Sequence, residues 1–125
     1  MTSEDDFQRA LDADPDDWQT RLVFADWLQD RDDQRAEGYR ALGLNQRVPI
    51  RRSARRWAWY SCRHTTGDDV TSWIRGVLPD FWATVRGSKI GSHRTRRAAE
   101  DAAALAFAKL PPERRAELLA VPVGA

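Results

Sequence analysis

Residues 21–28 of this 125-residue chain read Arg-Leu-Val-Phe-Ala-Asp-Trp-Leu, the most apolar part of a helix predicted over residues 18–30. At 100° per residue, the polar side chains of Gln19, Asp26 and Asp30 fall into one narrow stripe, and apolar side chains occupy most of the remaining circumference. A helix with so wide an apolar surface must be covered on more than one side. The sequence therefore predicts that this is the central helix of a small bundle, with Trp27 enclosed.

One charged side chain, that of Arg21, interrupts the apolar surface of this helix. An unpaired charge among apolar side chains is costly, so Arg21 requires a partner. Asp17 lies one helical turn before it and is the nearest candidate. We expect a structural ion pair between Arg21 and Asp17, in preference to a ligand-binding role for Arg21, and we expect Trp18 and Trp27 to be structural as well.

Two further helices are predicted beside the central one. The acidic residues after Ser3 favour a helix over residues 4–13, because carboxylates stabilise the positive end of a helix. A proline-containing turn at residues 14–17 separates this helix from the next. A third helix is predicted over residues 34–44, although Gly38 weakens it by roughly 1 kcal/mol relative to alanine.

Three motifs follow one another in this part of the chain. They are Phe-x-x-Ala-Leu-x-x-Asp-Pro-x-Asp at residues 7–17, the octapeptide at residues 21–28, and Arg-x-Asp-x-Arg-Ala-Glu at residues 31–37. With these motifs, residues 3–44 resemble the bacterial repeat-companion domain, a short module often found beside leucine-rich repeats or other repeat arrays. The resemblance implies a small helical module with no known catalytic residues, and it transfers no functional site to this chain.

The region after the helical module, residues 46–125, is predicted to mix strands with helices. Alternating aromatic residues favour a strand at residues 56–62, and weaker patterns favour strands at residues 70–77 and 89–93. Between the last two, a short helix that begins with Pro at its first position directs Val85 inward.

Two closing helices complete the predicted fold. Thr95 is a favourable cap for a helix over residues 96–110, and a proline pair precedes a last helix over residues 112–120. The predicted class is therefore α+β and mostly α-helical, with a three-helix module packed against a two- to three-stranded aromatic sheet and C-terminal helices. We expect residues 1–45 and residues 46–125 to form one compact unit.

Charge is distributed unevenly along the chain. Residues 1–45 contain twelve acidic and five basic residues, whereas residues 46–100 contain twelve basic and four acidic residues. Such a distribution indicates either two lobes that attract each other within one fold, or a basic face that binds a separate partner.

The basic part of the chain also contains a cluster of aromatic residues. Guanidinium groups and aromatic rings in one segment are typical of single-strand nucleic-acid binders, and they also suit an acidic protein surface. The sequence pI of about 8.0 lies below the range of many dedicated nucleic-acid binders. The candidate residues for binding a partner or a nucleic acid are Arg51, Arg52, Arg55, Arg56, Trp57, Trp59, Arg94, Arg96 and Arg97.

Metal and nucleophilic chemistry find little support in the sequence. Cys62, His64 and His93 offer three ligands, but structural zinc normally requires four, and the chain has one cysteine. Cys62 and His64 are two residues apart on a predicted strand, which does not by itself bring them into contact. No metal site, no cofactor and no enzymatic activity are therefore expected.

These observations lead to one expected function and one alternative. We expect a non-catalytic, adaptor-like module that binds another protein through its arginine-rich, aromatic segment, and nucleic-acid binding through residues 47–63 is the alternative. No apolar run reaches the length of about 18 residues that a transmembrane helix needs. The acidic N-terminus is unlike a secretion signal, and a lone cysteine suits a reducing compartment, so the expected location is the cytoplasm.

Overall fold

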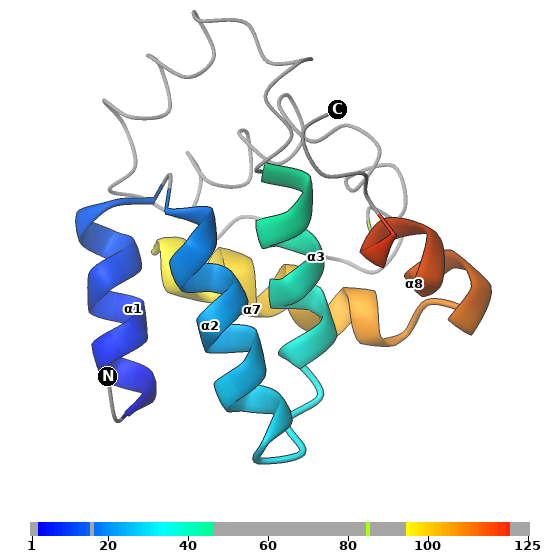
Figure 1. Ribbon diagram of the computed structural model, residues 1–125, viewed down its shortest axis with the longest axis horizontal. Helices are drawn as coiled ribbons and strands as arrows, with labels where there is room; N and C mark the ends of the chain where they lie inside the picture. The colour runs from blue at the N-terminus through cyan, green and yellow to red at the C-terminus, as the bar shows by residue number, and fades with distance from the viewer. Residues whose placement is uncertain (1–2, 16, 47–84, 86–94, 121–125) are drawn as a thin grey trace, which may run out of the picture.

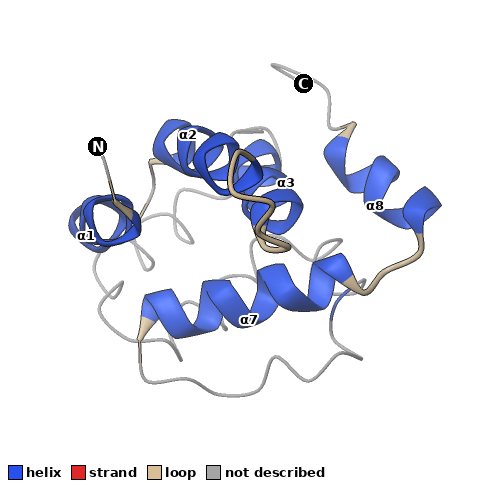
Figure 2. Ribbon diagram, turned by 90° about the horizontal axis from the view of Figure 1, so that it is seen from below, coloured by secondary structure: helices blue, strands red, loops and turns tan. Residues whose placement is uncertain are grey.

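The computed structural model describes residues 3–15, 17–46, 85 and 95–120 (Figure 1). Within these ranges the regular elements are the helices α1 (Glu4–Ala13), α2 (Trp18–Gln29), α3 (Ala36–Gln46), α7 (Arg96–Ala108) and α8 (Pro112–Leu119). Helices α1, α2 and α3 stand side by side, and α7 runs across them on one side (Figure 2). Helix α8 follows α7 and packs against α3.

The helix boundaries follow from local capping chemistry. The Ser3 hydroxyl accepts a hydrogen bond from the backbone N–H of Asp6, and the side chains of Asp17 and Thr95 cap α2 and α7 in the same way. Each cap supplies an acceptor to a backbone donor that has no partner within the helix. The five helices agree with the sequence prediction, and no boundary differs by more than two residues.

The predicted α+β class is wrong for the part of the chain that the structure describes, because its regular structure is helical and contains no strand. The physical reason lies in α7, which packs directly against the three-helix module. Its buried alanines permit close helix–helix approach, so a helix closes one side of the module. The segments predicted as strands, residues 56–62, 70–77 and 89–93, lie outside the described residues.

The first hydrophobic cluster lies between α1, α2 and α3. Its centre is aromatic: the ring centroids of Phe7 and Phe24 are 5.1 Å apart, and those of Phe24 and Tyr39 are 4.7 Å apart. Such close ring pairs add to the stabilisation from burial. The buried members are Phe7, Leu11, Phe24, Ala25, Leu28, Ala36, Tyr39 and Ala104.

Helix α2 is less enclosed than its composition predicts. Trp27 is half-buried, packs against Phe7 and Phe24, and carries the Arg31 guanidinium 3.6 Å from its ring centroid. Val23 is 56% exposed. The prediction that Trp27 is enclosed is therefore wrong, because α1 and α3 flank α2 while α7 meets it through the Arg21 side chain, which leaves the outer stripe of α2 open.

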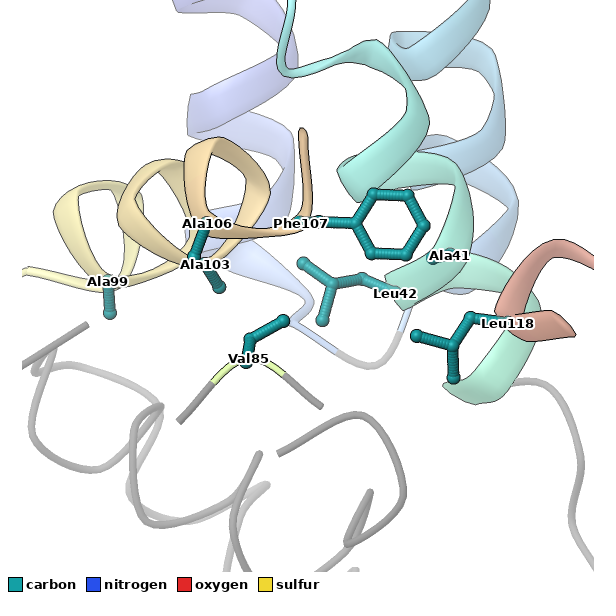
Figure 3. Packing of buried hydrophobic residues seen from close by; sticks show 8 residues of the cluster. All are labelled: Ala41, Leu42, Val85, Ala99, Ala103, Ala106, Phe107 and Leu118. Atoms are coloured by element: carbon teal, nitrogen blue, oxygen red, sulfur yellow. The ribbon is translucent and has the colours of Figure 1, made fainter. Parts of the chain in front are cut away.

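A second hydrophobic cluster joins α3, α7 and α8 (Figure 3). Val85 is fully buried in it, as its predicted inward orientation requires. The side-chain amide of Asn45 adds a polar link, donating hydrogen bonds to the backbone carbonyls of Ala41 in α3 and Leu118 in α8. The buried members are Ala41, Leu42, Val85, Ala99, Ala103, Ala106, Phe107 and Leu118.

None of the helices in the described ranges combines the length and the apolar character needed to span a membrane. The longest of them, α7, has 13 residues.

Helices α3 and α7 approach each other closely at Gly38. A Cβ atom built on Gly38 would lie 2.4 Å from the Cα and 2.7 Å from the Cβ of Ala104. Because the first of these atoms is backbone, it cannot turn aside as a flexible side chain would. The helix-weakening glycine seen in the sequence is therefore the residue that lets α7 dock.

We expect Gly38→Ala to destabilise the protein, although the same change at an open helical site usually stabilises it. The added methyl group would push α3 and α7 apart and lower the free energy of unfolding by about 1–3 kcal/mol. Urea denaturation followed by circular dichroism measures the change. The neighbouring, more exposed Glu37→Ala serves as the control and should shift stability by less than about 0.5 kcal/mol. A stabilised Gly38→Ala protein would contradict the close approach.

Candidate functional site

Charged side chains meet where α7 crosses the three N-terminal helices. Arg21 and Glu100 are 0% exposed and Arg96 is 1% exposed. The Arg21 Nε and Nη2 atoms donate to the two carboxylate oxygens of Glu100 at 2.8 and 2.9 Å, which makes a bidentate pair. Arg96 Nη1 donates to Glu100 Oε2 at 2.8 Å. One buried carboxylate therefore lies between two buried guanidinium groups.

The two arginines also donate hydrogen bonds to α1 and to the turn that follows it. Arg21 Nη1 donates to the carbonyl of Pro15. Arg96 Nε donates to the Asp12 carboxylate at 2.9 Å, and Arg96 Nη2 donates to the backbone carbonyl and the side-chain oxygen of Gln8. The partly exposed Asp12 thus supplies a second negative charge against the two buried positive charges.

A second group of polar side chains continues from Gln8. Its Nε2 atom donates to the hydroxyl of Tyr39 at 3.2 Å, and that hydroxyl donates to the Asp101 carboxylate at 2.6 Å. Arg35 in turn binds Asp101 at 3.0 Å and Glu4 at 2.9 Å. We call the whole set the polar network: Glu4, Gln8, Asp12, Arg21, Asp33, Arg35, Tyr39, Arg96, Glu100 and Asp101.

Burial and neighbouring charges shift the pKa values of Glu100 and Tyr39. Burial alone would raise the pKa of Glu100, but the positive charges of Arg21 and Arg96 outweigh it and hold that pKa at about 2. Desolvation, together with the nearby charges of Glu100 and Asp101, raises the pKa of Tyr39. At neutral pH, Glu100 is therefore ionised and Tyr39 carries its proton.

Arg35 has the same effect on the half-buried carboxylates around it. Hydrogen bonds from its guanidinium lower the pKa of Glu4 and that of Asp33. These bonds also raise the pKa of Arg35 itself. The ionised groups with shifted pKa values therefore keep their charges near neutral pH. The hydrogen bonds and ion pairs of the polar network join the helices to one another.

The expected partner of Arg21 is not the observed one. The Asp17 carboxylate accepts hydrogen bonds from the backbone N–H and the hydroxyl of Thr20, and so caps α2. The Arg21 guanidinium pairs instead with Glu100 of α7, 79 residues later in the sequence. Trp18 is half-buried at the start of α2, where its carbonyl oxygen lies close to Gly43.

Two of the arginines proposed as partner-binding residues have partners within the helical unit. Arg96 is 1% exposed, and its guanidinium binds Glu100 inside the polar network. Arg97 is partly exposed and pairs with Asp5 of α1 at 3.0 Å. The other candidates lie outside the described residues: Arg51, Arg52, Arg55, Arg56, Trp57, Trp59 and Arg94.

Sequence reasoning missed Glu100 and Asp101, although a signal for them was present. Both interrupt the alanine-rich sequence of α7, just as Arg21 interrupts the apolar surface of α2. Two opposite charges on apolar surfaces of distant helices are natural partners, because each needs a counter-ion when buried. The nearest carboxylate in sequence, Asp17, is used for capping α2, and the buried charge of Arg21 is matched by a carboxylate of a distant helix.

No group of three or more potential metal ligands occurs in the described ranges. The candidate ligands Cys62, His64 and His93 lie outside them. Comparison with known proteins adds no relative: no family model, no curated protein and no solved structure matches the chain.

Removing the negative charge at the centre of the polar network should destabilise the fold. In the variant Glu100→Gln, Arg21 and Arg96 remain buried and lose the charge of the carboxylate that lies between them, so we expect the free energy of unfolding to fall by about 3–5 kcal/mol. Urea denaturation at pH 7 measures this loss. The control is Glu117→Gln, which breaks the exposed pair with Arg114 and should cost less than about 1 kcal/mol. Equal effects in the two variants would contradict the central position of Glu100.

The lowered carboxylate pKa values predict where acid destabilises the protein. A carboxylate whose folded pKa lies below its unfolded value contributes stability above the unfolded pKa and loses it as the pH falls through the folded pKa. For Glu100 this window runs from about 4.5 down to about 2. We expect the free energy of unfolding to be nearly constant from pH 7 to 5 and then to fall, with about 3 kcal/mol due to Glu100.

Urea denaturation at a series of pH values from 7 to 2 tests this dependence. The exposed-pair variant Glu117→Gln should reproduce the wild-type profile. A marked loss of stability between pH 7 and 5 would show that Glu100 and its neighbours do not dominate the acid response.

Proposed function

We propose that this chain is a non-catalytic protein-interaction module of the cytoplasm. Its helices anchor an arginine- and tryptophan-rich segment, residues 47–84, and this segment binds another protein. The observation that carries the proposal is that both ends of residues 47–84 are attached to the same helical unit. Helix α3 leads into this segment at Gln46, and Val85 after it is buried between α3, α7 and α8. Binding residues are commonly held in this way by a rigid scaffold.

The division of charge supports a protein partner over a nucleic acid. Residues 47–94 contain ten basic and three acidic residues, whereas the rest of the chain contains sixteen acidic and ten basic residues. The negative helical part would repel a polyanion with phosphates along its whole length. An acidic patch on a folded protein is smaller and can contact the basic segment alone.

The polar network supports the proposal that the helices act as a scaffold for residues 47–84. Its buried charges bind one another across α1, α2, α3 and α7, and Glu100 and Tyr39 keep fixed protonation states near neutral pH. This network ties α7 to the N-terminal helices and so keeps the two ends of the intervening segment on one body.

The resemblance of residues 3–44 to the repeat-companion domain belongs to the same proposal. We infer that this part of the chain is a module of that kind, and the arrangement of α1, α2 and α3 as a small helical unit agrees with what the resemblance implies.

The experiment compares two full-length variants with the same change in charge. Arg51, Arg52, Arg55 and Arg56 are replaced by alanine in the test variant, and the basic residues Arg9, Arg40, Lys109 and Arg114 are replaced by alanine in the control. Tagged proteins are recovered from native cells, and co-purifying proteins are quantified by mass spectrometry. We expect a protein that the wild type and the control retain and that the test variant loses at least about tenfold, equivalent to about 1.4 kcal/mol.

A second measurement addresses the alternative. Fluorescence anisotropy with a labelled single-stranded oligonucleotide at low salt detects nucleic-acid binding, which should weaken steeply as salt is added. If the wild type binds the oligonucleotide tightly and the test variant does not, the partner of the segment is a nucleic acid and not a protein. A test variant that retains the same proteins as the wild type would contradict the proposed role of the segment.

A further inference from the structure

We draw no further inference here: the strongest candidate, the outer face of α2 with the exposed Val23 and the half-buried Trp27, carries nothing because the described part of the structure does not show what covers it.

Discussion

The fold depends on the neutralisation of one buried cation. Arg21 lies within the apolar surface of α2 and is completely removed from solvent, so α2 can be buried only with an anion beside it. Glu100 supplies that anion from a helix far along the chain and at the same time binds Arg96. The position of α7 follows from this requirement, and the positions of α8 and Val85 follow from α7 because all three share one hydrophobic cluster.

The helices were predictable because their signals are local. Caps such as Ser3 and Thr95, and the spacing of apolar residues, specify where helices begin and which surface they bury. The arrangement of the helices was less accessible, because the pairing of Arg21 with Glu100 joins residues with no local relation. Gly38 shows the same limit: in the sequence it is a residue that weakens a helix, and in the fold it is the point where two helices touch.

The candidate site was predictable only in part. Arg21 was identified as a buried charge from its apolar surroundings, but Arg96 was assigned to a binding surface because arginines near a helix start often contact phosphates. Its burial depends on Gln8, Asp12 and Glu100, which converge on it from two helices. A single sequence records the composition of α7 but not which of its sides meets α1, and that choice determines whether Arg96 is a ligand-binding residue or part of the interior.

The separation of 79 residues between Arg21 and Glu100 also bears on biosynthesis. At roughly 5–20 residues per second, the ribosome adds Glu100 about 4 to 16 s after Arg21. During that interval the nascent chain has the cation without its counter-ion, and the surface that will receive α7 stays open to water. A chain that ends before Glu100 would therefore lack the anion that the burial of Arg21 requires.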